Sequence, residues 1–184
     1  MAPNRYFLSF KISQIREHCF AESYSSFIRG LVSITGKEVG RGTLIRWERG
    51  QSTPKLTFLI AIAQLGSVSL DNILKPSYEL NVNAAPSELL NQLSPKMISD
   101  ISLKFGQIKN FPVERTVSKF SRDIFSEFGY NISTVKLTYW INGEHLPNPL
   151  YLYPLAHMAG ISVDELLVHP YPLDLIVVQE PNFY

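Results

Sequence analysis

The strongest constraint on the fold is an internal repeat. When the sequence is shifted by 93 residues, positions 11–74 align with positions 104–167 without a gap, and 17 of the 64 pairs are identical. A chance alignment of this composition would give about 4 identities. Many other pairs keep their chemical character, as Val39 and Ile132 do. The sequence therefore predicts one small fold built twice, and we call residues 11–74 the first copy and residues 104–167 the second copy.

The length suits two small domains and a connector. The chain has 184 residues, which permits one large domain or two of about 60 to 90 residues each, and the repeat favours two. We predict a first domain over residues 1–82, a connector over 83–103 and a second domain over 104–184. Domains this small are close to the lower limit for a self-sufficient core. The two copies are therefore expected to share an interface.

The composition is that of a globular protein and argues against several classes of function. Hydrophobic residues make up 45% of the chain and charged residues 18%. No transmembrane run or signal peptide is recognisable, so a cytoplasmic location is expected. The single cysteine, Cys19, excludes an internal disulfide and is expected to be a buried small hydrophobe. The sequence contains no zinc-ligand spacing, phosphate loop or nucleophile elbow, so we predict no enzyme activity, no cofactor and no metal.

Apolar periodicity predicts that both copies are all-helical. In the first copy it predicts five short helices, over residues 9–19, 25–34, 40–50, 56–65 and 69–74. Lys11 and Arg16 are expected on the solvent side of the first of these helices. In the second copy, Ser162 and Glu165 predict a capping box at the start of the last helix.

The segments that follow each copy carry two further patterns. Ser87 and the Ser94-Pro95 pair predict two short amphipathic helices in and after the connector. The alternating stretches Tyr-x-Leu-x-Val over residues 78–82 and Tyr-x-Leu-x-Leu over 171–175 predict short strands over 78–82 and 171–177. Because the two strands match under the repeat, we expect them to pair within one chain or across a dimer. A homo-oligomer through the connector or the C-terminal tail is the corresponding prediction.

Residues 40–50, with the sequence GRGTLIRWERG, predict a helix that reads DNA. Leu44 and Trp47 have the spacing of a core-facing stripe, and Gly50 suits the left-handed position that ends many helices. Guanidinium groups match guanine edges and phosphate oxygens in the major groove. An ordinary solvated helix face is the alternative interpretation, but the element occurs twice. The residues expected to face outward are Arg41, Thr43, Arg46 and Arg49.

The charge is unequally divided between the copies. The whole chain carries a net charge of +1, whereas residues 11–74 hold 8 basic and 5 acidic residues, and residues 104–167 hold 6 of each. Neutralisation of phosphates supplies most of the non-specific affinity of proteins for DNA. The first copy is therefore expected to be the stronger DNA contact.

Two stretches of the first copy carry a resemblance to a known family. The junction Trp-Glu-Arg-Gly-x-x-x-Pro over residues 47–54, followed by LIAIAQLGSVSLDNIL over 59–74, resembles the phage-repressor helix-turn-helix family of lambda repressor and Cro. The second copy matches more weakly, with LTYWINGEHLPNP and AHMAGISVDELL at the same places. The resemblance implies an all-α chain of two tandem five-helix helix-turn-helix domains, each with a third helix that enters the major groove.

The resemblance also implies roles for individual residues. In the first copy, Arg41, Thr43 and Arg46 would read bases or phosphates, and Arg49 and Lys55 would contact the DNA backbone. The matching residues of the second copy are Thr134, Lys136, Tyr139, Asn142 and Asn148. Glu48 is expected to bridge neighbouring backbone and arginines, and Trp47 and Trp140 are expected to anchor the two cores.

The sequence therefore predicts a sequence-specific regulator that binds double-stranded DNA and associates with the nucleoid when bound. Repression is favoured over activation, because a rigid reader can simply occlude a promoter. The alternative is an interaction protein, such as an antitoxin or an anti-regulator, in which the second copy holds a protein partner. In that alternative the contacts would come from Tyr139, Tyr151 and Tyr153.

Overall fold

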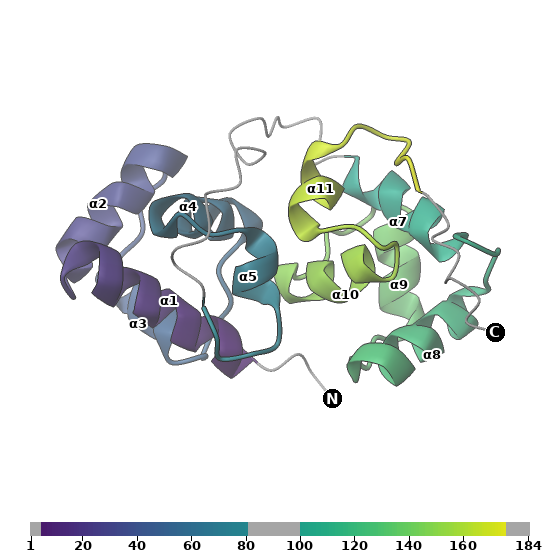
Figure 1. The fold of residues 1–184 in the computed structure, drawn as a ribbon, viewed down its shortest axis with the longest axis horizontal. Helices are drawn as coiled ribbons and strands as arrows, with labels where there is room; N and C mark the ends of the chain where they lie inside the picture. The colour runs from purple at the N-terminus through teal and green to yellow at the C-terminus, as the bar shows by residue number, and fades with distance from the viewer. Residues whose placement is uncertain (1–4, 81–99, 176–184) are drawn as a thin grey trace, which may run out of the picture.

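The computed structural model describes residues 5–80 and 100–175, and these residues form helices joined by short turns. The first half contains five helices, namely α1 (Arg5–Phe20), α2 (Tyr24–Thr35), α3 (Arg41–Glu48), α4 (Leu56–Gly66) and α5 (Leu70–Leu74). The second half contains α7 (Ile101–Lys109), α8 (Val117–Phe128), α9 (Thr134–Ile141), the 3-10 turn η2 (Pro149–Tyr151), α10 (Leu152–His157) and α11 (Val163–Val168). Figure 1 shows the two groups side by side, with α5 of the first facing α10 and α11 of the second. The prediction of an all-helical chain is confirmed for the described residues.

The repeat in the sequence is also a repeat in the backbone. The bounds of α8 and α9 lie 93 residues after those of α2 and α3. The starts of α2 and α8 are capped by the hydroxyl groups of Ser23 and Thr116, which accept from the amides of Ser26 and Lys119. Both helices end at a glycine in the left-handed region, with φ of +64° and +72°. Equivalent residues thus start and stop equivalent helices.

The copies differ most at their first and fourth helices. Helix α1 has 16 residues, whereas α7 has 9. The long helix α4 corresponds in the second copy to η2 followed by the short helix α10. Pro154 explains this break, because proline has no amide hydrogen to donate and its ring disfavours a continuous helix. Pro149 stands at the start of η2, where proline is tolerated.

Three predictions about the sides of α1 are wrong. Lys11 and Arg16 were expected in solvent but are 0% and 6% exposed, and Cys19 was expected in the core but is exposed. Helical periodicity assigns charged residues to the outer face, but it cannot register a carbonyl or carboxylate partner that lies elsewhere in the chain. Lys11 and Arg16 can lie on the buried side of α1 because each has such a partner there.

The partner of Lys11 is the end of the short helix α5. Its ammonium group donates to the carbonyl oxygens of Asn72 and Lys75, at the C-terminal end of that helix. The matching Lys104 donates to the carbonyls of Leu166 and Leu167 at 2.7 and 3.3 Å, at the end of α11. Burial lowers the pKa of each lysine to about 8. In each copy, therefore, one buried lysine donates hydrogen bonds to carbonyl groups at the C-terminal end of the last helix.

The predicted strands are not found in the described parts of their segments. Residues 78–80 and 171–175 form bends and irregular chain without a strand ladder. The rest of both predicted strands, residues 81–82 and 176–177, lies outside the described residues. The predicted connector helix after Ser87 lies outside them too. A side chain takes the place of a strand partner in the second copy. The amide group of Gln107 donates to the carbonyl of Leu173 and accepts from its backbone amide at 2.7 Å. This pair of bonds holds the extended tail against α7 without a sheet.

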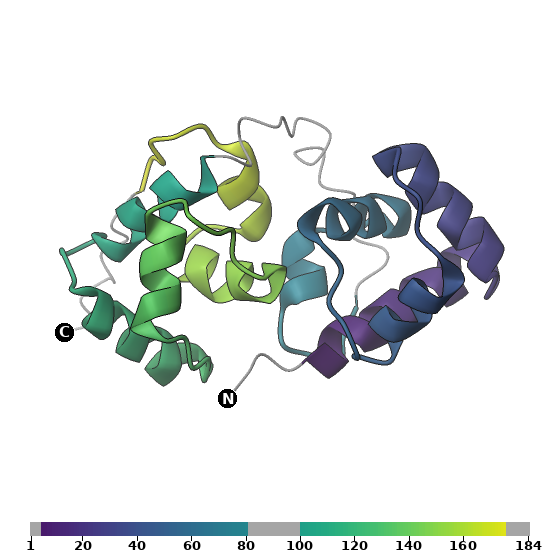
Figure 2. The ribbon, with the colours of Figure 1, turned by 180° about the vertical axis from the view of Figure 1, so that it is seen from behind.

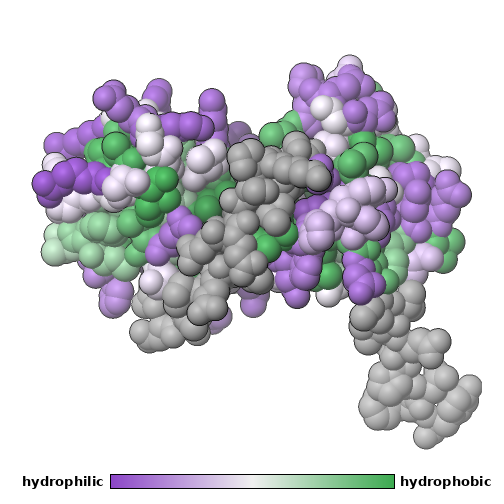
Figure 3. All heavy atoms as spheres, turned by 90° about the horizontal axis from the view of Figure 1, so that it is seen from above, coloured by the Kyte–Doolittle hydropathy of each residue, from purple (hydrophilic) through white to green (hydrophobic). Residues whose placement is uncertain are grey.

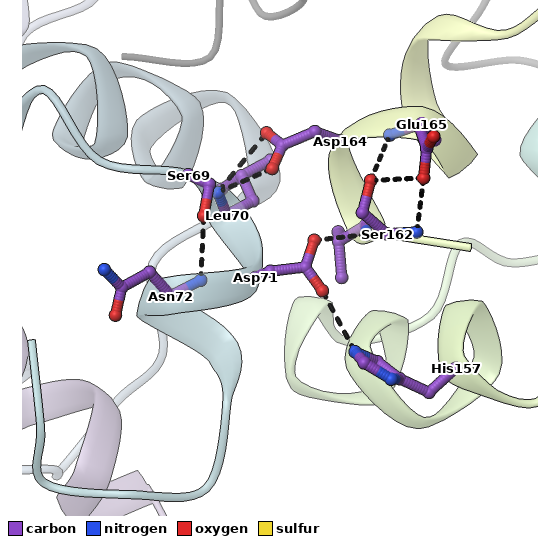
Figure 4. A network of polar contacts seen from close by, with 9 residues as sticks. Ser69, Leu70, Asp71, Asn72, His157, Ser162, Asp164 and Glu165 are labelled. Atoms are coloured by element: carbon purple, nitrogen blue, oxygen red, sulfur yellow. Dashed lines mark hydrogen bonds and ion pairs between the residues drawn. The ribbon is translucent and has the colours of Figure 1, made fainter. Parts of the chain in front are cut away.

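The two copies meet through their last helices, as the size argument predicted, and the contact is reciprocal (Figure 4). Asp164, on α11, accepts from the backbone amide of Leu70 at the start of α5 at 3.1 and 3.3 Å. Asp71, on α5, accepts from the amide of Val163 at the start of α11 at 2.5 Å, and its other oxygen lies 3.1 Å from Nε2 of His157. Asp71 and Asp164 occupy matching positions of the repeat. Each copy therefore supplies an acceptor to an unpaired amide in the first turn of the other copy's last helix.

The surface is mixed outside this contact. On the face shown in Figure 3, hydrophilic residues cover much of both halves, and apolar residues reach the surface in separate patches.

Within each half, the final helix also starts from its own hydroxyl cap, Ser69 for α5 and Ser162 for α11. The capping box predicted at Ser162 and Glu165 is confirmed.

The contact predicts a pH-dependent stability that Asp164 controls. Burial raises the pKa of Asp164 from 3.8 to about 6, against the opposing effect of the amide of Leu70. The folded state therefore favours the protonated carboxyl of Asp164. The stabilisation that this form provides is fully present below about pH 4 and is lost as the pH rises through 6. The asparagine of the Asp164→Asn variant cannot ionise, so the free energy of unfolding of this variant should fall less than that of the wild type between pH 4 and pH 7. The two decreases should differ by up to about 3 kcal/mol. Urea titrations at a series of pH values measure this difference.

The control for that experiment is Asp174→Asn, which makes the same change of net charge at an exposed position. A wild type and an Asp164→Asn variant with parallel pH profiles would contradict the prediction.

Candidate nucleic-acid interface

Helix α3 is held in place by a buried stripe on its inner side. Leu44 is 0% exposed and Trp47 is 5% exposed, and the Trp47 ring packs 5.2 Å from that of Phe58 on α4. In the second copy, Trp140 packs 5.1 Å from Tyr151 in the same way. The prediction that both tryptophans anchor a core is confirmed. Each indole fixes how its helix is turned, and thereby which residues face outward.

The basic residues that were predicted to face outward from α3 lie on its outer side. Arg41, Arg46 and Arg49 are exposed, as is Lys55 beyond the following turn, and Thr43 is half-buried. Nη2 of Arg46 donates to Oγ1 of Thr43 at 3.2 Å. Two of the predicted readers are therefore in contact, one helical turn apart.

The one acidic residue of α3 faces away from this surface. Oε1 of Glu48 accepts from Nε of Arg16 at 2.6 Å, and Oε2 accepts from the hydroxyl of Tyr24 at 2.7 Å. The side chains of Arg16 and Glu48 are each 7% exposed. The prediction that Glu48 bridges to an arginine is confirmed, but its second partner is the Tyr24 hydroxyl and not the predicted neighbouring backbone. Its charge is compensated inside the first copy, and the exposed face of α3 keeps only cations.

Tyr24 links this buried network to the first outer arginine. The guanidinium of Arg16 lies 4.2 Å from the centre of the Tyr24 ring, and that of Arg41 lies 5.0 Å from it. Cations attract the face of an aromatic ring at such distances. The hydrogen bond to Glu48 raises the pKa of the Tyr24 hydroxyl, which keeps it a donor. Tyr24 thus provides a fixed platform at the start of α3.

The second copy presents a different surface at the same position. Its predicted readers Thr134, Lys136, Tyr139 and Asn142 are all exposed, but only Lys136 is charged. Several are engaged locally, since the amide of Asn142 donates to Glu144 at 3.2 Å and the Tyr139 ring lies 5.5 Å from that of His145.

Apolar side chains add to the exposed surface of this copy, where Val135 is 58% and Leu146 is 56% exposed. Asn148 is exposed too, but its side-chain oxygen caps η2 by accepting from the amide of Leu150 at 3.0 Å.

The network around Glu48 has no counterpart in the second copy. Val117, Ile141 and Lys109 stand at the positions of Tyr24, Glu48 and Arg16. Sequence reasoning therefore missed Tyr24 and Arg16 as parts of the site, because the repeat offered no matching pair to draw attention to them. No local pattern marks these contacts, because Tyr24 and Arg16 lie 24 and 32 residues from Glu48 along the chain.

The two outer faces lie in different halves of the molecule. Seen from behind in Figure 2, α3 and α9 both come to the near side, one in each half. The predicted residues of the first copy therefore gather on one half and those of the second copy on the other, and none of the hydrogen bonds or ring contacts described above joins the two groups.

Comparison with protein-family models, curated proteins and solved structures found no match. Among the described residues, no helix has both the length and the apolar character needed to cross a membrane.

The buried ion pair predicts a large difference between two carboxylates that both contact Arg16. Glu48→Gln should lower the free energy of unfolding by about 3 kcal/mol, because it removes the buried counter-charge of a buried guanidinium. Glu17→Gln is the matched control, since Glu17 lies 3.3 Å from the same guanidinium but its side chain is 53% exposed. That change should cost less than about 1 kcal/mol. Equal losses in urea denaturation would contradict the assignment of Glu48 as the principal partner of Arg16.

Proposed function

We propose that the chain is a sequence-specific regulator that binds double-stranded DNA, with α3 as its principal reading helix and α9 as an auxiliary one. The observation that carries the proposal is the sidedness of α3. Three exposed arginines project from a helix whose inner face is anchored by Trp47 and whose only carboxylate is turned inward onto Arg16. Such a face suits phosphate oxygens and the acceptor-rich edge of guanine.

Pre-organisation of the cations supports the same function. Arg41 rests against the ring of Tyr24, and Arg46 is bonded to Thr43. Long side chains lose conformational entropy when a ligand fixes them. These contacts already restrict Arg41 and Arg46 in the absence of DNA, so binding should cost less entropy. We assign base or phosphate reading to Arg41, Thr43 and Arg46, and backbone contacts to Arg49 and Lys55.

The second copy is proposed to contribute less affinity. Helix α9 offers Lys136 as its only cation, together with Thr134, Tyr139 and Asn142. Because two readers of unlike chemistry belong to one chain, we expect an operator made of two unlike half-sites. Repression by occlusion is the proposed mode of action, within a helix-turn-helix fold of the phage-repressor type.

A second candidate function rests on the apolar exposure of α9. Val135, Tyr139 and Leu146 are exposed, and the first copy has Gly42, Arg46 and Thr53 at the matching positions. This favours a protein partner for the second copy. Of the other tyrosines predicted for that role, Tyr151 is 9% exposed and packs against Trp140. Tyr153 is half-buried, 4.1 Å from the His157 ring. Tyr151 is therefore unavailable, because the second core uses its ring.

The proposal is tested by selecting bound sequences from random duplex DNA and titrating the recovered site. Arg46→Ala should weaken binding by about 1 to 3 kcal/mol, the contribution of one good bidentate contact to a base. Lys136→Ala should cost less. Lys75→Ala, which removes an exposed cation at the end of α5, is the control for loss of charge. Fluorescence anisotropy at fixed salt concentration measures all three.

Binding should also fall steeply with salt concentration, because cations on α3 displace counterions from phosphates. Recovery of no DNA sequence, or equal and negligible losses for Arg46→Ala and Lys136→Ala, would remove the DNA-reading proposal. Capture of a protein partner that Val135→Lys abolishes would instead support the second candidate.

Tyr24 provides a separate test of pre-organisation. Tyr24→Leu removes the ring under Arg41 and should weaken DNA binding by about 1 kcal/mol, the value of an exposed cation–ring contact. The loss should largely vanish in an Arg41→Ala background, where the ring has no guanidinium to hold. Additive losses in this double-mutant cycle would show that Tyr24 acts independently of Arg41.

A further inference from the structure

A cavity of about 310 Å³ lies between the two copies. We call it the inter-copy cavity. One wall is formed by Lys55 and Leu56, at the start of α4 in the first copy, and the other by Leu146, Pro147, Pro149 and Leu152 of the second copy. Leu56 and Pro149 occupy matching positions of the repeat, so the cavity lies between equivalent parts of the two copies.

The lining defines the chemistry of an occupant. Leucine and proline side chains supply most of the wall, and Lys55 is the only charged residue among the described lining residues. The volume is at the lower end of the range for small-molecule sites, which often lie between domains. An apolar cavity of this size favours a compact apolar body over water. The one cationic residue of the described lining, the exposed Lys55, favours a negative charge on that body.

We propose that the inter-copy cavity binds a small carboxylic acid with a compact apolar body, and that its occupant weakens DNA binding. The first half of this proposal concerns the cavity alone. The second half rests on the proposed DNA-binding function. The carboxylate pairs with Lys55, and the apolar body packs against the leucines and prolines of both walls.

The coupling to DNA follows from the turns that join each reading helix to the cavity wall. The amide of Gln51 donates to the carbonyl of Arg46 at 2.8 Å, and the matching amide of Glu144 donates to that of Tyr139 at 2.9 Å. Each turn is thus hydrogen-bonded to the reading helix that precedes it. An occupant that moves the two walls apart also moves α3 relative to α9. Its carboxylate further competes with a DNA phosphate for Lys55.

Binding is tested first without DNA, on the full chain, with 4-isopropylbenzoate and the uncharged 4-isopropylbenzyl alcohol as probes. Calorimetric titration should show tighter binding of the acid. In the methyl NMR spectrum, shifts should concentrate on Leu56, Leu146 and Leu152. Leu103, which is 52% exposed on α7 and does not line the cavity, should not shift. No heat, or shifts spread evenly over exposed leucines, would overturn the site.

Two variants locate the contacts. Leu146→Glu places a negative charge at the edge of the cavity, at a residue exposed enough to tolerate it, and should weaken the acid by about tenfold. Leu103→Glu makes the same substitution at similar exposure and should leave the affinity unchanged. Lys55→Gln should abolish the preference for the acid over the alcohol. Equal effects of Leu146→Glu and Leu103→Glu would overturn the placement.

The final step repeats the DNA titration with a saturating concentration of the acid. The dissociation constant for the selected duplex should rise at least about fivefold for the wild type and remain unchanged for Leu146→Glu. An unchanged constant in the wild type, together with confirmed binding of the acid, overturns the coupling. A chain that binds the acid but no DNA refutes the proposed function and leaves the cavity assignment standing, whereas DNA binding without acid binding refutes the cavity alone.

Discussion

The arrangement of the molecule depends on the reciprocal contact between α5 and α11, the last helices of its two copies. Asp71 and Asp164 each accept from a backbone amide in the first turn of the other copy's last helix. Helices of five and six residues are too short to be stable alone in water. Each meets its own hydroxyl cap and an aspartate oxygen of the other copy at its start, and a buried lysine of its own copy at its end. The inter-copy contact is therefore part of what makes each copy complete.

Within this frame the two copies have kept their cores and changed their surfaces. Tryptophan, glycine and proline recur at the end of α3 and α9, where they fix the helix and its turn. Among the described residues, the polar network of Arg16, Tyr24 and Glu48 occurs only in the first copy. On the outer side of α9, Val135 and Tyr139 are exposed where α3 has Gly42 and Arg46. Burial constrains a core position to a small set of side chains, whereas an exposed position can change at little cost in stability. The difference in charge between the copies therefore lies mainly at exposed positions, which can change while the core is kept.

Much of the fold could be predicted from the sequence, because helix ends and core stripes leave local signals. The helix containing Leu44 and Trp47, its end before Gly50, and the capping box at Ser162 were all readable from spacing alone. The buried state of Lys11 and Arg16 was not, since their partners lie 61 and 32 residues away along the chain. The described residues of the strand expected after the second copy form no ladder for a related reason. Alternation of apolar residues indicates extended chain, but it cannot reveal that Gln107 occupies the backbone groups that a neighbouring strand would have used.

The covalent link between the copies has a consequence for how the molecule behaves at low abundance. Two identical chains that met through such a small contact would separate on dilution, because association competes with the entropy of two free bodies. In one chain the connector keeps the copies at a high effective concentration that does not depend on how many molecules are present. The contact at Asp71 and Asp164 therefore forms as fully in a dilute solution as in a concentrated one. A few molecules per cell would carry both outer faces in the same fixed arrangement.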